Sequence, residues 1–534
     1  MAEGKEPGAQ VPDFGEQYDV VVVGAGIGGL VSGALLAGEG LKVLVVERGK
    51  RPGGYVTAYE RKGYRFQVPH LVAGCGPDGD ITRVANHLGL KVEFARVDPY
   101  QRCIYPDHDI QVRCDVEAFK NTLKDNFQTQ TENINQFFKA VSSVQKGLDI
   151  RMMRRPMGAG SMLKYPVYPL LHPRFFRYMV GRSTFQDMLD RFFTDEKLKA
   201  VLSTSWYWMG TPPWEISPLG MIGMMGAFRG GAYFPVGGYD ELSNGFTAAL
   251  IENGGELLLD HEVTSVNAEH GRVSEVEMHP RAIVKTTVVI SDCDTRRTFF
   301  RLVNRENLTE AFLKKLEKRQ LSTSGLVVHL GMAKKIEDES FACGSVLVQP
   351  SYDLREAFEE ISVTDRYPDP GKIGFMVTVP SMVDPTLAPE GKTCLDLLVP
   401  GVPYDFMGRW GVESGGVRGE RYRSIKEKYA EVVVEAATMA FPGLVSDVEA
   451  YDVSTPITYE RHTMSIDGCW YDDALIPGQV LGRRYGPRTS LRGLYITGSK
   501  SALGGGICSS IMSGVLAADS VLKGKLGALI SAPH

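Results

Sequence analysis

Three glycines near the start of the chain have the spacing of a phosphate-binding loop. Gly24, Gly26 and Gly29 follow the apolar run 20–23 and open a stretch with helical patterning. In a G-x-G-x-x-G pattern the first glycine permits a tight turn, the second lets the backbone approach a pyrophosphate, and the third lets the helix pack on a sheet. The phosphates would then lie at a helix N-terminus, where unpaired N–H groups and the helix dipole favour negative charge.

A second apolar run, residues 43–46, ends in an acid at the interval that ribose binding requires. The carboxylate of Glu47 is expected to accept hydrogen bonds from a ribose diol. Two strands joined by a helix form one βαβ unit, which Arg51-Pro-Gly-Gly54 closes with a turn. Glycine-rich turns alone are common, but the flanking strands and the acid make this signal strong. The unit predicts that the protein holds a dinucleotide.

Residues 20–38 are apolar enough to raise the alternative of a membrane span. Several glycines and a serine interrupt this run, and neither a basic n-region nor a small-residue cleavage site accompanies it. We therefore interpret it as the first strand and helix of the nucleotide-binding unit, and expect a cytoplasmic protein.

Composition sets further bounds. A chain of 534 residues exceeds one typical domain, so two large lobes are expected. A net charge of −5 provides no broad positive field for nucleic acid. The eight cysteines are scattered without a C-x-x-C pair, which argues against a zinc site, an iron–sulfur cluster or a dithiol centre. We expect no metal.

Patterning along the chain divides it into five segments after a polar start, residues 1–17, that we expect to be disordered. The dinucleotide signature ends near residue 115, strand-rich material returns after residue 215, and a second strand-turn-helix unit closes the chain. We expect a nucleotide-binding domain from residues 18–115, 215–300 and 451–534. A substrate domain would comprise a helical part, 116–214, and a sheet part, 301–450.

Three separated blocks resemble the phytoene desaturase family, which includes carotenoid isomerase-like and retinol saturase-like flavoproteins. They are residues 24–57, residues 210–238 with Gly210-Thr-Pro-Pro213 and Pro235-Val-Gly-Gly238, and residues 493–518. The resemblance covers nearly the whole chain in the right order. It implies an α/β fold, with a Rossmann-like FAD-binding domain of the glutathione reductase/amine oxidase type and an α+β substrate domain.

The resemblance also implies which residues hold FAD. Gly53-Gly54 would form the turn beneath the cofactor, Val263 would meet the adenine through its backbone, and residues 504–507 would bring a helix N-terminus toward the flavin. A positive helix end there stabilises negative charge on a reduced flavin. The expected cofactor-binding residues are Gly24, Gly26, Gly28, Gly29, Glu47, Arg48, Gly53, Gly54, Val263, Gly498, Ser499, Gly505, Gly506 and Ile507.

Three positions depart from the family pattern where flavin and substrate would meet. Ser499 stands where members often carry an acid, and Tyr55 stands where a basic residue is common. Gln67-Val-Pro-His70 replaces a segment in which many members have an aspartate and a glycine. His70 and Tyr55 are the catalytic candidates, because an imidazole or a phenol can transfer a proton. The alternatives are a structural histidine and a tyrosine that only packs beside the flavin.

Other groups have two interpretations each. Residues 164–179 combine aromatic, basic and proline residues, and would form either a lid over an apolar tunnel or a membrane-surface patch. His462 would face the cavity or the surface, and Lys500 would contact cofactor or substrate. Cys508 is expected to pack rather than react. A basic helical set is expected to be a solvated face: Lys314, Lys315, Lys318 and Arg319.

Taken together, the residues and the resemblance predict an FAD-dependent oxidoreductase. It would exchange a hydride between flavin N5 and a carbon of an isoprenoid, polyene or other lipid-like substrate, by desaturation, saturation or isomerisation. No second nucleotide-binding unit is evident, so the electron acceptor is left open. The alternatives are an amine oxidase-like flavoenzyme and a non-enzymatic lipid-binding escort of the same fold, and peripheral membrane contact is compatible with each.

Overall fold

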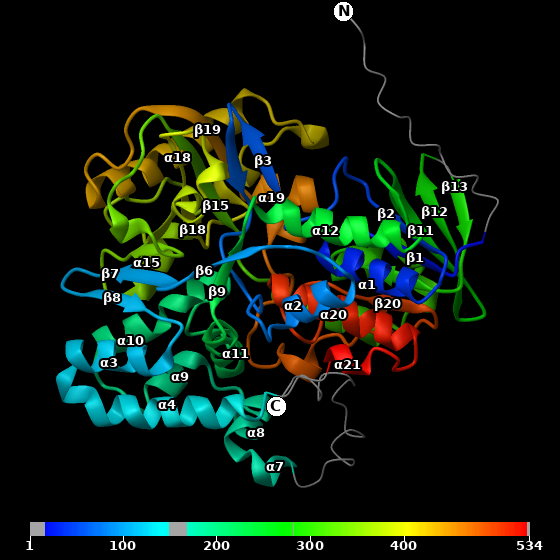
Figure 1. Cartoon of the computed structure of the whole chain (residues 1–534), viewed down its shortest axis with the longest axis horizontal. Coiled ribbons are helices and arrows are strands. Elements are labelled where there is room, and N and C mark those ends of the chain that lie inside the picture. Colours follow the sequence, from blue (N-terminus) through cyan, green and yellow to red (C-terminus); the bar gives the residue numbers. More distant parts are fainter. Residues whose placement is uncertain (1–16, 149–167, 281, 531–534) are drawn as a thin grey trace, which may run out of the picture.

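The computed structural model describes residues 17–148, 168–280 and 282–530. Nearly all of the polar start, residues 1–17, which is expected to be disordered, and residues 164–167 of the aromatic and basic stretch 164–179 therefore lie outside the described residues, whereas residues 168–179 are described. The described elements form two lobes that lie side by side (Figure 1).

A five-stranded parallel sheet forms the centre of the first lobe, in the order β10-β2-β1-β14-β20. Its strands come from three separated parts of the chain. All four valines of β1 are at most 4% exposed, as expected for a parallel strand covered on both faces. The strands are β1 (Val20–Val23), β2 (Val43–Val46), β10 (Glu256–Leu258), β14 (Val289–Ser291) and β20 (Leu494–Ile496).

Three helices cover one face of this sheet, and a β-meander covers the other. Helix α1 (Ile27–Gly38) packs against both α12 (Tyr239–Glu252) and α20 (Ile507–Val521). The meander consists of β11 (Glu262–Glu269), β12 (Arg272–His279) and β13 (Ala282–Lys285), and its apolar side chains share a core with those of β1 and β2.

Glycines set how closely these layers approach. A Cβ atom at Gly29 would lie 2.2 Å from the carbonyl oxygen of Gly24, so only glycine lets α1 start this close to the end of β1. A Cβ at Gly514 of α20 would lie 2.6 Å from the carbonyl oxygen of Gly28. The sequence-based role of Gly29 in helix packing therefore has a direct geometric basis.

The second lobe contains a seven-stranded mixed sheet in the order β19-β15-β18-β17-β16-β7-β8. All its pairs are antiparallel except β16 with β7. The β7–β8 hairpin lies within residues 18–115, so the expected domain boundary at residue 115 does not coincide with the edge of this sheet. The strands are β7 (Gln101–Ile104), β8 (Asp109–Val112), β15 (Gly325–Met332), β16 (Val346–Val348), β17 (Phe375–Thr378), β18 (Thr393–Pro400) and β19 (Val448–Ser454).

Alternation along these strands gives the sheet two different faces. One face packs beneath α15 (Leu354–Ile361) and α18 (Glu420–Ala440), in a separate apolar core. Three small antiparallel strands connect the lobes, namely β5 (Val72–Ala73), β6 (Phe94–Val97) and β9 (Ala232–Pro235). A two-stranded hairpin, β3 (Ala58–Arg61) and β4 (Tyr64–Gln67), lies beside β15 and β18.

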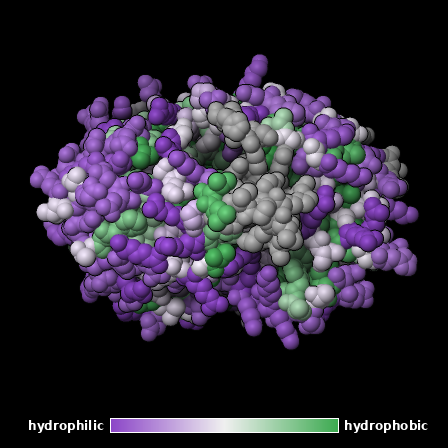
Figure 2. Space-filling model, turned by 90° about the horizontal axis from the view of Figure 1, so that it is seen from below, coloured by the Kyte–Doolittle hydropathy of each residue, from purple (hydrophilic) through white to green (hydrophobic). Residues whose placement is uncertain are grey.

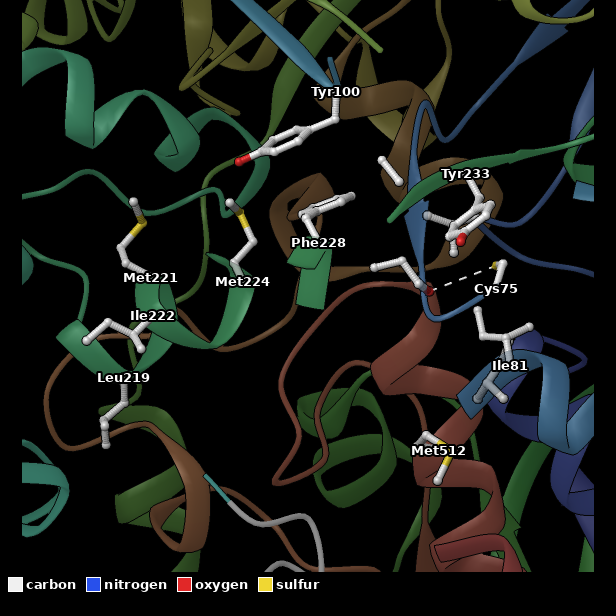
Figure 3. Close-up of a cluster of buried hydrophobic side chains, with 14 of the residues drawn as sticks. Cys75, Ile81, Tyr100, Leu219, Met221, Ile222, Met224, Phe228, Tyr233 and Met512 are labelled. Carbon is white, nitrogen blue, oxygen red and sulfur yellow. Dashed lines mark hydrogen bonds between the residues drawn. The ribbon is translucent and has the colours of Figure 1, made fainter. Parts of the chain in front are cut away.

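A group of helices lies below the mixed sheet in Figure 1 and shares the largest hydrophobic core with the nucleotide-binding lobe. Figure 3 shows the junction: Met221, Met224 and Phe228 of α11 face Tyr100, which stacks on Phe228 with 4.9 Å between ring centroids. Met512 of α20 and Ile81 of α2 lie on the other side of the cluster. The helices of this group are α3 (Val116–Asn126), α4 (Thr131–Gln145), α7 (Tyr168–Leu171), α8 (Pro173–Val180), α9 (Phe185–Leu189), α10 (Glu196–Ser203) and α11 (Pro218–Arg229). Helix α2 (Asp80–His87) belongs to the first lobe and packs against α20.

The contact at Gly29 generates a first prediction. Gly29→Ala should lower the free energy of unfolding by about 1–3 kcal/mol, because the methyl group meets a backbone carbonyl that cannot rotate away. Chemical denaturation measures this change.

Gly38→Ala, at the other end of α1, is the matched control. Its Cβ would find its nearest atom at 3.5 Å, and alanine is the better helix former, so stability should be unchanged or slightly raised. Equal effects of the two substitutions would contradict the role assigned to Gly29.

Candidate dinucleotide and substrate site

A cavity of about 320 Å³ runs along the carboxyl ends of the parallel strands and continues to the mixed sheet of the second lobe. The carboxyl edge is where open α/β sheets bind their ligands. At the far end the wall is apolar, with Val327 of β15, Met376 of β17 and Leu398 of β18 paired side by side in the sheet. One cavity therefore joins the glycine loop to an apolar surface.

Most of the predicted cofactor-binding residues line this cavity. The exceptions are Gly29, which lies behind the loop against Gly24, and Gly505, where a Cβ would meet the ring of Tyr471 at 2.5 Å. Both catalytic candidates, Tyr55 and His70, line the cavity as well. The lining members of the predicted set are Gly24, Gly26, Gly28, Glu47, Arg48, Gly53, Gly54, Val263, Gly498, Ser499, Gly506 and Ile507.

Two helices begin at the cavity directly after a glycine. Gly26 precedes α1 and Gly506 precedes α20, and neither can supply a side-chain acceptor to the first turn. Unsatisfied N–H groups at such helix ends attract anionic groups. The turn at Gly53 is held against the loop, because its N–H donates to the carbonyl oxygen of Ala25 at 2.7 Å.

Glu47 connects the end of β2 to the glycine loop. Its Oε2 accepts the N–H of Ala25 at 2.9 Å, and its Oε1 accepts the N–H of Gly49 at 2.6 Å. Because each carboxylate oxygen has two acceptor sites, these bonds leave acceptor capacity for a ribose hydroxyl. Val263 of the meander lines the same end of the cavity.

Asp292 is a site residue that the sequence analysis did not identify. It follows β14, its side chain is 7% exposed, and its Oδ2 accepts the N–H of Gly29 at 3.0 Å. A Cβ at Gly26 or Gly498 would lie 2.3 Å from an Asp292 oxygen, so glycines leave room for this carboxylate. An acid directly after a buried strand was the available signal, because neighbouring parallel strands end at one edge of the sheet.

Lys500 provides the compensating charge. Its buried ammonium lies 3.8 Å from Asp292 Oδ1. Burial raises the pKa of Asp292, and the positive charge of Lys500 is the main effect that lowers it. A carboxylate beside a phosphate-binding loop would repel a phosphate, so this lysine balances the charge of the site.

Tyr55 and the segment after α19 (Pro456–Thr463) form one wall of the cavity. The Tyr55 hydroxyl donates to the carbonyl oxygen of Cys469 at 3.0 Å and lies 3.1 Å from Ser465 Oγ, while its ring lies 5.9 Å from that of Tyr459. Burial raises the pKa of Tyr55. Its proton is therefore held by a backbone carbonyl, and the catalytic role of Tyr55 stays a prediction.

Two acids that line the cavity, Asp294 and Asp472, form hydrogen bonds that hold the local backbone in place. Asp294 caps the short helix α13 (Thr295–Arg297) by accepting the N–H groups of Arg296 and Arg297, and Asp472 accepts the N–H and hydroxyl of Thr295. Burial, followed by repulsion from Asp472, raises the pKa of Asp294.

The remaining sequence-based expectations have mixed outcomes. His462 lines the cavity, and burial and neighbouring arginines lower its pKa. Cys508 lies in the first turn of α20, where burial raises the pKa of its thiol to about 12, so it packs as a neutral group. The expectation for Arg319 is wrong: its side chain is 4% exposed and pairs with Asp473. Arg319 lies beyond the end of α14 (Glu310–Glu317), where the chain turns inward.

Surface features bear on membrane contact. Leu170 and Leu171 of α7 are 78% and 70% exposed. Figure 2 shows this lower side of the molecule, where hydrophobic side chains form small groups on a mainly hydrophilic surface. None of the helices in the described part of the chain is long and apolar enough to cross a membrane.

Among the described residues, no group of three or more His, Cys, Asp and Glu side chains is arranged to hold a metal ion.

The parallel sheet, the glycine loop, the meander and the opposed mixed-sheet lobe define a Rossmann-like dinucleotide-binding fold of the glutathione reductase/amine oxidase type, as predicted. Residues 22–88 match the model of the NAD(P)-binding Rossmann-like domain. Solved structures agree on this fold. An oxidoreductase from Methanosarcina mazei has a TM-score of 0.64 at 19% identity, covering 94% of this chain and 99% of that one. Cyclohexylamine oxidase from Brevibacterium oxydans has a TM-score of 0.62 at 15% identity, covering 95% and 99%.

Sequence relatives confirm the resemblance to the phytoene desaturase family. Prolycopene isomerase 1 from an Oncidium hybrid cultivar is 25% identical over 520 residues, which is 95% of this chain and 84% of that protein. All-trans-retinol 13,14-reductase from Danio rerio is 25% identical over 95% of this chain and 86% of its own length. The neurosporene-forming phytoene desaturase of Rhodobacter capsulatus is 24% identical over 94% and 93%.

The Asp292–Lys500 pair generates a second prediction. Lys500→Met should lower the free energy of unfolding by about 3 kcal/mol at neutral pH, because it leaves a buried carboxylate uncompensated. Asp292→Asn combined with Lys500→Met should recover most of this loss. A surface control, Lys525→Met, breaks the exposed pair with Glu39 and should change stability by less than about 1 kcal/mol.

The loss of stability caused by Lys500→Met should depend on pH in a definite direction. A carboxyl whose folded-state pKa is raised favours folding when protonated, and that contribution is lost as pH rises from its unfolded value of 3.8 through the folded value. The Lys500→Met defect should therefore be smallest near pH 4 and grow as pH rises. Denaturation midpoints measured across this range test it, and a defect independent of pH would exclude the charge explanation.

Proposed function

We propose that this protein is an FAD-dependent oxidoreductase that acts on C–C or C=C bonds of a largely apolar isoprenoid, polyene or other lipid-like substrate. The observation that carries the proposal is the single cavity that joins the glycine loop to the apolar wall of the second lobe. A cofactor at one end and an apolar molecule at the other would meet inside it.

The chemistry of the cavity fits FAD. Two helix N-termini face it, at Gly26 and Gly506, and they suit the pyrophosphate and the flavin respectively. Glu47 retains acceptor capacity for the ribose, and Lys500 offsets the nearby carboxylate. When bound, FAD supplies hydride exchange at flavin N5. The predicted cofactor-binding residues that line the cavity would hold it.

The chain itself contributes orientation, exclusion of water and one polar group. Val327, Met376 and Leu398 would hold an apolar substrate by contact alone and keep water from the reacting carbons. His70 is placed at this end of the cavity and can hold or accept a proton at an imidazole nitrogen. This division of tasks explains why no nucleophile–base pair is needed.

Relatives named as an isomerase, a desaturase and a reductase support an enzyme acting on polyenes. The amine oxidases share the fold at 15% identity, and no observation favours an amine over an apolar substrate. An escort protein would not need the Glu47 contacts and the intact glycine loop.

Purified protein should be yellow, with a two-banded flavin spectrum and about one FAD per chain. Gly26→Ala should reduce bound flavin strongly, because its Cβ would meet Asp292 at 2.3 Å in the phosphate-binding loop. Gly223→Ala, where a Cβ meets nothing within 4 Å, is the matched control and should keep its flavin. A colourless wild-type protein that gains no spectrum with added FAD would refute the proposal.

Anaerobic titration then distinguishes the reactions. A desaturase should have its flavin bleached by a saturated substrate, whereas a saturase should need a prior reductant and should be reoxidised by a polyene. An isomerase should convert its substrate with no net change in flavin absorbance. Flavin absorbance and product analysis in the same cuvette provide both readouts.

A further inference from the structure

Two residues that line the apolar end of the cavity have a buried polar atom without a hydrogen-bond partner, the donor Trp208 Nε1 and the imidazole nitrogen His70 Nε2. His70 lies between β4 and β5, its side chain is 4% exposed, and it lines the cavity. Its Nε2 atom is buried without a hydrogen-bond partner. Buried polar groups are nearly always hydrogen-bonded, so an unsatisfied one at a ligand cavity indicates a group that the ligand satisfies.

The other ring nitrogen faces a buried polar cluster in the mixed sheet. His70 Nδ1 lies 3.7 Å from Asp396 Oδ2 and 3.4 Å from Thr378 Oγ1. Asp396 is fully buried, and its Oδ1 accepts the Nδ1–H of His329 at 2.7 Å. His329 Nε2 in turn lies 3.3 Å from Ser454 Oγ.

Strand register brings this cluster together. His329 of β15 and Thr378 of β17 both pair directly with Asp396 of β18. Two residues along the same strands, Val327, Met376 and Leu398 pair in the same way and form the apolar wall. The sheet face therefore changes from apolar to polar within one side-chain repeat, and His70 lies at the change.

The Thr378 hydroxyl can pair with either tautomer of His70, but the charge of Asp396 favours the one with its proton on Nδ1. The Oδ2 atom of Asp396 has no hydrogen-bond partner, and a proton on His70 Nδ1 would face it. The opposite tautomer would direct a lone pair at a buried carboxylate. Burial also lowers the pKa of His70 to about 4, so the ring is neutral near pH 7 and carries a single N–H. Nε2 is then a hydrogen-bond acceptor.

We propose that His70, positioned by Asp396 and His329, forms a subsite that accepts a hydrogen bond from a hydroxyl group of an otherwise apolar substrate. The inference rests on the proposed function, since it specifies the substrate class of that cavity. A pure hydrocarbon would leave Nε2 unsatisfied, and an aldehyde would oppose it with a second acceptor. His70 contacts the substrate, whereas Asp396 and His329 are positioning residues.

The test compares two probes of equal size, the C15 isoprenoid alcohol farnesol and its aldehyde farnesal. Calorimetric titration of the full-length, flavin-loaded protein should show farnesol binding about tenfold more tightly than farnesal, the difference that one hydrogen bond makes. Bound flavin is quantified in the same sample. Equal binding of the two probes would overturn the proposal.

Variants distinguish the loss of the proposed hydrogen bond from a general loss of structure. His70→Phe should bring the farnesol/farnesal ratio close to one, while His70→Gln, which offers an amide oxygen, should restore part of it. Asp396→Asn should lower the ratio with His70 still present, because the amide no longer selects the Nδ1–H tautomer. Exposed His87 of α2 gives the control: His87→Phe should leave the ratio unchanged.

A second measurement keeps the proposal testable if the His70 variants do not fold. In wild-type protein labelled with ¹⁵N-histidine, His70 should carry its proton on Nδ1, and its Nε2 signal should shift with farnesol but not with farnesal. A proton on Nε2 would overturn the proposal. If flavin is bound but the alcohol preference is absent, the subsite fails and the proposed function stands. If no flavin binds, the proposed function fails, and the probe preference still decides the subsite.

Discussion

The close approach of α1 to the end of β1 is the constraint on which the site depends. With Gly29 against the carbonyl oxygen of Gly24, the first turn of the helix lies directly at the carboxyl edge of the parallel sheet. The ends of β2, β14 and β20 then converge on the same point. A bulkier residue would move the helix outward and would separate its N-terminus from the carboxylates and the lysine that surround it.

Charge in this crevice is balanced locally. The protein places its own carboxylate, Asp292, on an N–H group of the first turn of α1, where a phosphate would also be attracted. Lys500 follows β20, the neighbouring strand, and lies within ion-pairing distance. Two residues more than 200 positions apart therefore act as one electrostatic unit. At the other end of the cavity a buried acid is again placed beside basic groups, since Asp396 lies next to both His329 and His70.

The sequence was most informative where function depends on contiguous residues. The glycine loop, Glu47 and the turn at Gly53-Gly54 fall within one short stretch, because a βαβ unit is local in the chain. Three of the seven strands of the mixed sheet, β15, β17 and β18, are visible in the sequence as apolar runs, and residues 422–441, which fall almost entirely within α18, have helical periodicity. The burial of Arg319 could not be predicted, because a basic residue after a helix has the same sequence pattern whether its side chain faces water or a buried acid.

Residue types and spacing by themselves determined the nucleotide-binding unit, since a βαβ unit depends on local geometry. The fold class of the whole chain and the apolar substrate were expected from the resemblance to the phytoene desaturase family. Only the tertiary structure decided that Asp292 and Lys500 form a pair and that His70 meets Asp396 and His329. These contacts depend on strand order and register, which bring distant segments to one edge or one face. The sequence of a single strand does not indicate which other strands will pair with it.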